Sequence, residues 1–517
     1  MLRAVLLVLV LHAGSAFVTP RAAGRRDGGL NARQESAPAR SVVADVLPEW
    51  TAEAQASFLA TYWQKKPVLI RGLFFGTSGR NPRIPTKDDL LQLSTDDDVE
   101  SRILMQGKDG QWTKEYGPFD ESFLGRFRRD EASAGAGRLS WTVLVQEVDR
   151  HIPAVADLWS AFDFVPAWRR DDIMMSFASP GGGIGAHVDN YDVFLLQGRG
   201  RREWSIEGVF LTAEQEEARE VRGSQTRLIR DFGAGGPVQS WVLEAGDVLY
   251  LPPRVPHRGT ALDGGCTTVS FGFRAPAYRS LLTALTSFVC EASLAEGDLY
   301  ADPDLHLHRN SAGAEVSPEA LERIRSRLNQ EVQAVLGSPQ LFGDFAGRYL
   351  TEPLRMQGRS TRPFFIDTQG QQSGAAKSKK EEEEEEVEED EEEEDYDDGS
   401  DELPLSISSS HAVASKSLFP SAEAVLEAAR QEQVLLRRAE GVRCLALGGS
   451  VYYNGEPFPL PELDARKGAL LADAACSREI DSDAIGVLLG QGPGSVGIAR
   501  FLCSLLRSGL FYPVDKK

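Results

Sequence analysis

Two short stretches of the chain decide its fold: residues 181–202 read GGGIGAHVDNYDVFLLQGRGRR, and residues 246–257 read GDVLYLPPRVPH. His187 and Asp189 are two positions apart in a strand-like run, and side chains at such positions point to the same face of a strand. His257 follows a second strand-like run, which closely spaced prolines bring to an end. We therefore expect these three side chains to meet around one ligand.

Two imidazoles and one carboxylate can hold a metal ion from one side and leave its other positions open, as in non-haem Fe(II) oxygenases. We therefore predict His187, Asp189 and His257 as the metal ligands and catalytic centre of a redox enzyme. An isolated H-x-D is more often a solvated strand edge, so the prediction depends on the second motif, where a strand expected over 241–251 leads to His257. Of the other histidines, we expect His306 and His308 at the surface and His12, His151 and His411 in structural or exposed positions.

Both stretches resemble the two motifs of the cupin superfamily, and the resemblance extends further along the chain. Residues 187–206 read HVDNYDVFLLQGRGRREWSI, residues 62–68 read YWQKKPV, and residues 272–276 read GFRAP. Together they resemble the Jumonji C (JmjC) ribosomal oxygenases, especially the bacterial branch that hydroxylates an arginine of a large-subunit ribosomal protein. The similarity covers residues 46–355 and returns near the C-terminus.

This resemblance implies a mainly β catalytic core, the double-stranded β-helix or jelly roll of cupin and JmjC proteins, in residues 46–278. The sequence agrees with it, because residues 166–278 read as strands separated by Gly and Pro turns. Residues 46–165 mix a helix over 53–63 with short strands and loops that would pack before the barrel.

Three further segments follow the core. Residues 279–355 have helical periodicity, with helices expected over 278–291 and 318–336; in the family such a segment mediates dimerisation, and a helical cap on the barrel is the alternative. Residues 356–415 are expected to be a disordered linker. Residues 416–517 resemble the winged-helix α+β domain that closes the ribosomal oxygenases. Acidic residues dilute its arginines, so we expect it to contact protein, with no direct nucleic acid contact.

The resemblance also implies Fe(II), the co-substrate 2-oxoglutarate and O2. Fe(II) on the three predicted ligands would keep two positions for the keto acid of 2-oxoglutarate and one for dioxygen. The distal carboxylate needs a cation inside the barrel, because a buried anion without a partner is costly. Arg202 has the family's position for that partner, and an arginine can donate two parallel hydrogen bonds. Ser176 is a second candidate donor, whereas Arg199 and Arg201 are expected to be solvated.

A substrate pocket is implied in the same way. Asp172, Met174, Tyr191 and Ser270 match positions that line the pocket of the arginine-hydroxylating relatives. An acid that meets a guanidinium and an aromatic face for its planar cation suit an arginine. Without the resemblance, Asp172 could close a turn and Tyr191 could belong to the core. Histidine-selective relatives share the iron motif, so this motif does not choose the substrate.

The net charge of −21 comes mainly from one segment. Residues 381–402 contain 18 acidic side chains and no basic one, and the rest of the chain is close to balanced. Such a run cannot bury enough apolar surface to fold, so we expect a self-repelling linker. The alternative is contact with basic ribosomal protein tails or mimicry of nucleic acid. The charge gives no sign of a general nucleic-acid binder.

The first residues resemble targeting signals. Residues 1–16 have the apolar run and small residues of a signal peptide, and the run is too short to span a bilayer. Residues 17–45 resemble a disordered transit peptide, rich in arginine and poor in acids. Together they resemble the bipartite presequence of algae with complex plastids, which predicts plastid localisation; the nucleus or nucleolus and the secretory pathway are alternatives. The five cysteines form no C-x-x-C pair, which argues against a disulfide-stabilised secreted domain.

Taken together, the sequence predicts an Fe(II)- and 2-oxoglutarate-dependent dioxygenase. We expect it to hydroxylate a ribosomal protein, at an arginine of a large-subunit protein, to form a homodimer through its helical segment and to have no membrane partner. The alternatives are a histidyl hydroxylase, a JmjC histone lysine demethylase and, outside the enzymes, a non-catalytic cupin that acts as a ribosome assembly factor.

Overall fold

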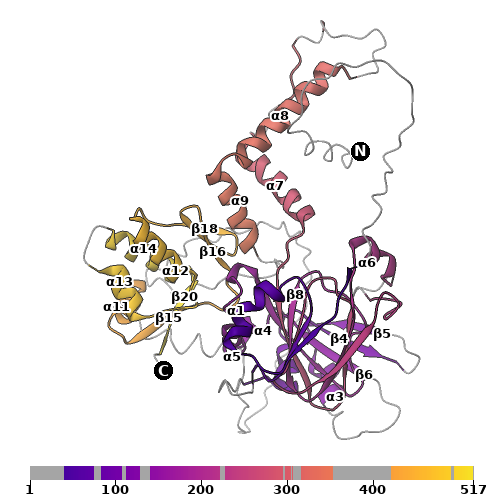
Figure 1. The fold of residues 1–517 in the computed structure, drawn as a ribbon. Coiled ribbons are helices and arrows are strands. Elements are labelled where there is room, and N and C mark those ends of the chain that lie inside the picture. Colours follow the sequence, from indigo (N-terminus) through magenta and orange to yellow (C-terminus); the bar gives the residue numbers. More distant parts are fainter. Residues whose placement is uncertain are drawn as a thin grey trace, which may run out of the picture. The chain divides into compact units, whose positions relative to one another are not determined.

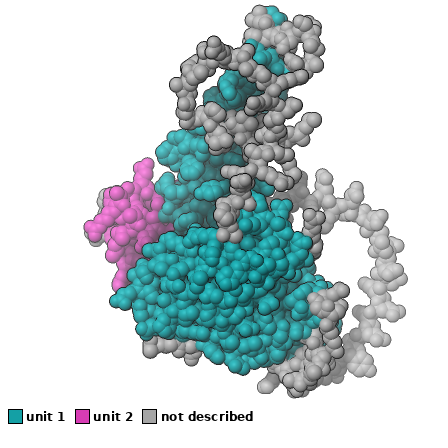
Figure 2. Space-filling view, turned by 45° about the vertical axis from the view of Figure 1, so that its right-hand side comes forward, with its two compact units in different colours: residues 1–358, 443–458 teal, residues 359–442, 459–517 magenta. Residues whose placement is uncertain are grey.

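The computed structural model describes most of the predicted catalytic, helical and C-terminal segments. The described residues are 40–74, 83–107, 112–128, 140–221, 228–294, 297, 299–303, 306, 316–352, 421–490 and 494–515. The predicted signal peptide, most of the transit-peptide-like segment and the acidic linker lie outside them, as do His12, His308 and His411. The chain divides into two compact units (Figure 2): residues 1–358 with 443–458, and residues 359–442 with 459–517.

Two sheets form the catalytic part of the first unit (Figure 1). The larger has nine strands in the order β2 (Asp45–Leu47), β3 (Val68–Ile70), β12 (Val248–Leu251), β8 (Asp192–Arg199), β14 (Cys266–Phe273), β7 (Arg170–Ala178), β6 (Ser140–Val145), β4 (Ser101–Gln106) and β5 (Trp112–Tyr116). The smaller has the order β11 (Val238–Leu243), β9 (Arg202–Glu207) and β13 (His257–Ala261), and a separate pair joins β1 (Arg40–Ser41) to β10 (Val209–Phe210). The chain passes between the sheets from β8 to β9, β11 to β12, β12 to β13 and β13 to β14, which is the jelly-roll topology and confirms the predicted fold class.

The central strands of the large sheet, such as β8 and β14, are buried on both faces. In β14, Val269, Phe271 and Phe273 pack in the hydrophobic core, whereas the alternate residues Thr268 and Ser270 line a cavity on the other face. This alternation is the period of two that a strand imposes on its side chains. One face of the sheet therefore packs in the core, and the other places polar side chains in the wall of the cavity.

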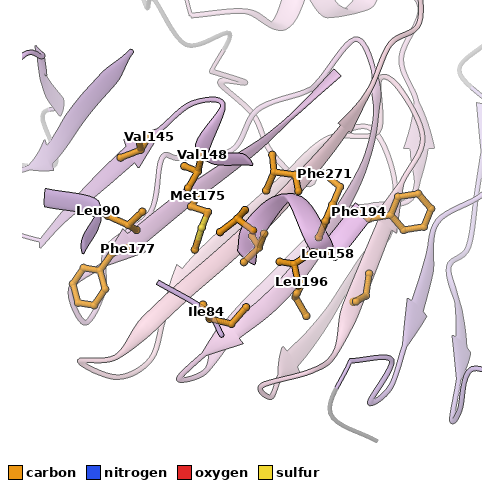
Figure 3. Close-up of a cluster of buried hydrophobic side chains, with 14 of the residues drawn as sticks. Ile84, Leu90, Val145, Val148, Leu158, Met175, Phe177, Phe194, Leu196 and Phe271 are labelled. Carbon is orange, nitrogen blue, oxygen red and sulfur yellow. The ribbon is translucent and has the colours of Figure 1, made fainter. Parts of the chain in front are cut away.

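Aromatic rings dominate that core. Phe162 lies 4.5 Å from Phe194 and 4.6 Å from Phe271 between ring centroids, and all three rings are fully buried (Figure 3 labels the latter two). Each fully buried ring of this size stabilises the fold by roughly 1.5–3 kcal/mol. Phe162 ends a short 3-10 helix of the segment before the barrel. That segment therefore packs against the barrel, as the sequence predicted.

The segment before the barrel and the loops of the jelly roll contribute short helices. They are α1 (Ala52–Thr61), α2 (Lys87–Leu93), α3 (Glu121–Arg128), α4 (Val148–His151), α5 (Pro153–Ala156), η2 (Asp157–Phe162), η3 (Ala167–Arg169) and α6 (Ala213–Arg219). The predicted helix over 53–63 is confirmed as α1. Thr51 begins this helix by accepting the N–H of Ala54, and its first turn carries Glu53, as the positive end of the helix dipole favours.

The strand predicted over 241–251 is wrong in one respect, because this run forms two strands. β11 ends at Leu243 in the small sheet and β12 begins at Val248 in the large one. Gly246 has a positive φ of 96°, and the Asp247 carboxylate accepts the N–H of Glu244 at 2.9 Å. Glycine adopts this backbone conformation without a steric penalty, so the chain can turn here between two apolar strands.

Helices follow the barrel, as predicted. They are α7 (Tyr278–Ser293), α8 (Pro318–Leu336) and α9 (Pro339–Thr351). Ser317 and Ser338 cap α8 and α9 by accepting backbone N–H groups, and each is followed by a proline, which suits the first helical position. Across the described ranges, no helix has the length and apolar character needed to span a membrane.

A small antiparallel sheet from the C-terminal region, residues 443–458, also belongs to the first unit and is called the hairpin below. Its strands are β16 (Cys444–Leu447), β17 (Ser450–Tyr453) and β18 (Glu456–Pro459). It packs on α9, where Gly347 leaves room for the Tyr452 ring and the Tyr452 hydroxyl donates to Asp344 at 3.1 Å.

The second unit is a small α+β assembly. Its sheet has the order β19 (Glu479–Ile480), β15 (Val434–Arg438) and β20 (Phe511–Asp515), and its helices are α11 (Ala422–Arg430), α12 (Ala465–Cys476), α13 (Ser482–Leu489) and α14 (Ser495–Arg507). Helices and strands are thus present where the sequence predicted the closing α+β domain.

Candidate metal centre

His187 and His257 lie side by side because their backbones pair. They form an isolated antiparallel bridge, in which the N–H of His187 donates to the carbonyl of His257 at 3.0 Å and the reverse bond measures 2.9 Å. Residues directly opposite each other in an antiparallel pair have side chains on the same face. The strand expected around His187 is wrong: this residue bridges both Leu228 and His257 in single pairs, and the strand begins only at Asp192.

Asp189 completes the group from the same loop as His187. Its carbonyl accepts the N–H of Arg254 at 2.7 Å, which ties this loop to the proline-rich loop before His257. Arg254 has a positive φ of 64°, an uncommon conformation for a residue with a side chain. The contact between the two loops therefore helps to hold Asp189 beside the two histidines.

The three side chains are spaced as ligands of one ion. Nε2 of His257 lies 3.5 Å from Asp189 Oδ2, and Nε2 of His187 lies 4.0 Å from Asp189 Oδ1. One ligand atom from each residue falls within 4.8 Å of the others. Ligand bonds of roughly 2.0–2.2 Å around one transition metal require donor atoms at about these separations. Elsewhere in the described ranges, His151 is half-buried in α4 and His306 is exposed, as predicted.

Hydrogen bonds prepare both imidazoles for a metal. Nδ1 of His187 contacts the carbonyl of Gly185 at 3.1 Å, and Nδ1 of His257 contacts that of Val255 at 2.9 Å. A carbonyl can only accept, so each Nδ1 carries the proton and each Nε2 offers its lone pair. Burial, and then the neighbouring His187, lower the pKa of His257 to about 4. The neutral form that binds metal is therefore favoured at physiological pH.

A cavity of about 230 Å³ opens beside this group between the two sheets. The large sheet supplies residues of β4, β6, β7, β8 and β14, and the small sheet supplies residues of β9 and β13. The cavity thus lies between the sheets and has the three candidate ligands in its wall.

Arg202 points a buried guanidinium towards this interior. The residue is 3% exposed, its Nε donates to Cys266 Sγ at 3.3 Å, and its charged carbon lies 5.6 Å from the centre of the Trp204 ring. Within the described structure, its Nη2 has no hydrogen-bond partner. An unpaired buried donor is costly, and a carboxylate bound in the cavity would satisfy it.

The neighbouring arginines point elsewhere, as predicted. Arg201 pairs with Asp263 at 3.4 Å and its side chain is 52% exposed, while Arg199 donates to the carbonyl of Ile84 at 2.7 Å. Ser176 lines the cavity from β7, where its strand partner is Thr268 of β14.

Of the four predicted substrate-pocket residues, Met174, Tyr191 and Ser270 line the cavity. Asp172 is not part of its wall, and its carboxylate accepts the N–H of Glu147 at 3.2 Å. Although Tyr191 is 37% exposed as a residue, burial of its hydroxyl raises the pKa well above the ordinary value, and the carboxylates of Asp189 and Asp172 act in the same direction. Both carboxylates therefore lie close to this tyrosine.

Among the lining residues that the sequence reasoning missed, Trp204, Thr268 and Arg102 carry the aromatic and polar side chains. Trp204 is two positions after Arg202, and Thr268 is two positions before Ser270. The period of two along a strand could have found both of these. Arg102 comes from β4, and its place in the wall depends on strand pairing across the sheet.

Comparisons with known proteins agree with this geometry. A family model described as JmjC domain matches residues 157–281. The chain is 33% identical over 291 residues to the ribosomal protein uL16 3-hydroxylase of Escherichia coli K12, covering 56% of this chain and 70% of that protein. It is also 33% identical over 280 residues to the probable ribosomal oxygenase of Haemophilus influenzae, covering 54% of this chain and 61% of that protein.

Solved structures of the E. coli ribosomal oxygenase YcfD are similar as well. One in complex with cobalt and 2-oxoglutarate matches with a TM-score of 0.58 and 25% identity, covering 89% of this chain and 97% of that one. Another E. coli ycfD structure matches with a TM-score of 0.60 and covers 98% of its own chain.

Proposed function

The chain belongs to the JmjC ribosomal oxygenases, which are 2-oxoglutarate-dependent hydroxylases, and we propose that it hydroxylates an arginine of a large-subunit ribosomal protein. One observation carries the proposal: the His-Asp-His group and a buried arginine with an unpaired Nη2 line the same cavity. A catalytic metal and an anionic co-substrate need these two features together.

The donor atoms suit the group that the family uses. Nε2 of His187, a carboxylate oxygen of Asp189 and Nε2 of His257 would hold Fe(II), and Arg202 would pair with the distal carboxylate of 2-oxoglutarate. Ser176 would donate its hydroxyl to the same carboxylate. With O2, the bound iron and 2-oxoglutarate supply the oxidative decarboxylation that places a hydroxyl on an unactivated C–H bond.

The chain's own residues bind and orient the reactants. The Nδ1 contacts of the two histidines hold both rings in the metal-binding tautomer, and Cys266 steadies Nε of Arg202. The two sheets line the cavity from opposite sides. At the mouth, Tyr191 and Asp172 would receive the substrate guanidinium, because an aromatic face and a carboxylate both attract a planar cation.

The substrate class rests on two supports. The E. coli relative acts, by its name, on the ribosomal protein uL16. In this chain, the aromatic ring of Tyr191 lines the cavity and the Asp172 carboxylate lies close to it, so an acid and an aromatic ring are available together for a cationic side chain.

Mass spectrometry of ribosomal peptides tests the function directly. Peptides containing arginine or histidine are incubated with the purified protein, Fe(II), 2-oxoglutarate and oxygen. We expect a gain of one oxygen on an arginine, and no gain with His187→Ala. Oxidation of a histidine instead would identify a histidyl hydroxylase, and loss of methyl groups from a histone peptide would identify a demethylase. If no peptide is oxidised and 2-oxoglutarate is not consumed in the absence of peptide, the protein is better described as a non-catalytic binding protein.

We also propose a homodimer formed through the helical segment. Leu321, Ile324 and Leu328 of α8 are exposed apolar residues spaced by three and four, which places them on one face of the helix. Light scattering of the wild type and of a variant with all three changed to serine tests this proposal. A variant of unchanged mass would contradict it.

Plastid localisation is a further proposal, which rests on the predicted presequence. A fluorescent protein fused behind residues 1–45 is expected in the plastid of an alga with complex plastids. Fluorescence in the nucleus or in the culture medium would contradict this expectation.

A further inference from the structure

The first residues of β7 lie where the ladder of the large sheet is irregular. In the described ladder, β6 pairs with β7 only from Met175 to Ala178. On the other side, the register of β14 shifts between Phe271 and Phe273, opposite Asp171 and Asp172. Regular strand pairing therefore does not hold these two aspartates in place, and other contacts must do so.

Asp172 belongs to the inward row of this strand. Residues at alternate positions share a face, and Met174 and Ser176 of that row line the cavity. The missing side chain of Gly272 leaves room for the aspartate, since a Cβ there would lie 3.3 Å from Asp172 Oδ1. The orientation of Asp172 towards a substrate thus depends on how the irregular end of β7 is fixed.

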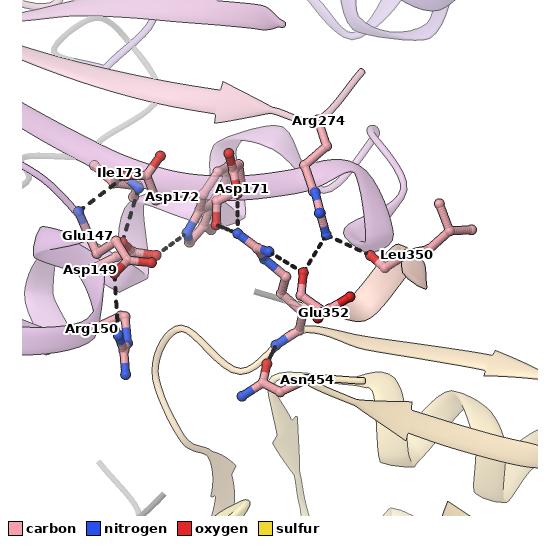
Figure 4. Close-up of polar contacts among 12 residues, drawn as sticks. Glu147, Asp149, Arg150, Asp171, Asp172, Ile173, Arg274, Leu350, Glu352 and Asn454 are labelled. Atoms are coloured by element: carbon pink, nitrogen blue, oxygen red, sulfur yellow. Dashed lines mark hydrogen bonds and ion pairs between the residues drawn. The ribbon is translucent and has the colours of Figure 1, made fainter. Parts of the chain in front are cut away.

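Asp171 points to the opposite face, where an arginine from far along the chain meets it (Figure 4). Arg443 comes immediately before β16, is buried, and pairs with the Asp171 carboxylate through Nη2. Its Nη1 donates to the carbonyl of Glu352 at 2.8 Å, and its backbone N–H donates to Asn454 Oδ1 at 2.9 Å. Arg443 therefore joins β7 to the end of α9 through its guanidinium and belongs to the hairpin through its backbone.

A second arginine strengthens this junction. Arg274 donates to the carbonyls of Leu350 and Glu352 at 3.0 and 2.8 Å. Burial, and then the neighbouring Arg443, lower the pKa of Arg274 to about 10, while Asp171 acts in the opposite direction. Two guanidiniums thus converge on the Glu352 carbonyl, and one of them, Arg443, also holds the Asp171 carboxylate.

We propose that Arg443 is a positioning residue for the substrate pocket: it holds Asp171 so that the adjacent Asp172 faces the incoming cationic side chain. The inference deepens the proposed function and rests on it. It makes the hairpin of residues 443–458, which follows the catalytic core by more than 150 residues in the sequence, part of the substrate-binding machinery.

Steady-state kinetics of Arg443→Ala and Arg443→Lys test this role. We expect KM for an arginine peptide to rise roughly tenfold in Arg443→Ala, as a misplacement of about 1 Å near a site can cause, with kcat and 2-oxoglutarate affinity changed less than about twofold. Arg443→Lys keeps the charge but lacks the planar guanidinium that reaches Asp171 and Glu352 together, so its KM should lie between those of the wild type and Arg443→Ala. It also provides the comparison should Arg443→Ala fail to fold. The matched control is Arg507→Ala, an exposed arginine paired with Glu423.

A double-mutant cycle with Asp171→Asn isolates the contact. Both single variants should raise the peptide KM, and the double variant should raise it no further, because the second change removes a contact that is already lost. Additive effects, an unchanged peptide KM in a folded variant, or an equal loss of 2-oxoglutarate affinity would each overturn the inference. A wild-type protein that oxidises no peptide refutes the proposed function instead, so the two failures are distinguishable.

Discussion

Replacing Arg202 by methionine tests the co-substrate site most directly. The change removes a buried cation whose Nη2 has no partner among the described residues, and retains a side chain of similar length. Each hydrogen bond to a charged group contributes about 1.5–3 kcal/mol, so two parallel bonds to a carboxylate contribute about 3–6 kcal/mol. At 1.4 kcal/mol per factor of ten, 2-oxoglutarate should bind roughly 10²- to 10⁴-fold more weakly.

The same substitution should not destabilise the protein in the absence of ligand. In the described structure, the guanidinium donates one hydrogen bond, to Cys266 Sγ, and makes a cation–π contact with the Trp204 ring. Replacing a buried charge by an apolar side chain of similar volume is often neutral or stabilising. The Tm without 2-oxoglutarate should therefore stay the same or rise, while the increase in Tm that 2-oxoglutarate causes should disappear.

Calorimetric titration of 2-oxoglutarate into the Co(II)-loaded protein, beside thermal melts, measures both effects. Arg201→Met is the matched control, because Arg201 is exposed and pairs with Asp263. Binding by Arg202→Met within a factor of ten of the wild type would refute the assignment. So would an equal loss of binding in Arg201→Met.

Three further predictions concern pH, packing and the core. Because the pKa of His257 falls from 6.5 in the unfolded chain to about 4 on folding, its contribution to stability is complete above pH 6.5 and declines as the pH falls towards 4. Urea unfolding of the metal-free protein should show a decline of roughly 1.4 kcal/mol per pH unit in that window, and a His257→Gln variant that keeps the same slope would contradict the cause. Gly347→Ala should lower the Tm, since its Cβ would overlap the ring of Tyr452, whereas Gly343→Ala on the same helix should leave the Tm unchanged or raise it; equal melts for the two would argue against this packing. Phe162→Ala should reduce the free energy of unfolding by about 3–5 kcal/mol, because the ring is fully buried between two other phenylalanine rings, and a loss below about 1 kcal/mol in chemical denaturation would show that the site is not close-packed.

The candidate metal centre could be predicted because its residues stand in two local motifs. His187 and Asp189 are separated by one residue, and His257 follows a run that glycine and proline punctuate. The strand predicted around His187 and Asp189 was nevertheless wrong, since an isolated bridge between His187 and His257 brings the side chains together. The predicted grouping of the ligands still holds, because this backbone pairing places both imidazoles on one face.

Other features depended on contacts that no local pattern contains. The run 241–251 is predicted as one strand, but a turn at Gly246 divides it between two sheets. Which face of β7 meets the cavity follows from the pairing of β6, β7 and β14. A pattern of period two shows alternation but does not say which set of side chains faces the site.

The sequence by itself determined the candidate ligands, which stand at short, regular spacings, and, through its resemblance to the JmjC ribosomal oxygenases, the jelly-roll class and the choice of Arg202. Only the tertiary structure decided that Arg202 has an Nη2 without a partner among the described residues in the wall of the cavity, and that Arg443 meets Asp171 across 272 positions of the chain. Burial and pairing at such separations arise from packing between sheets, helices and the hairpin, and packing has no signature in the order of neighbouring residues.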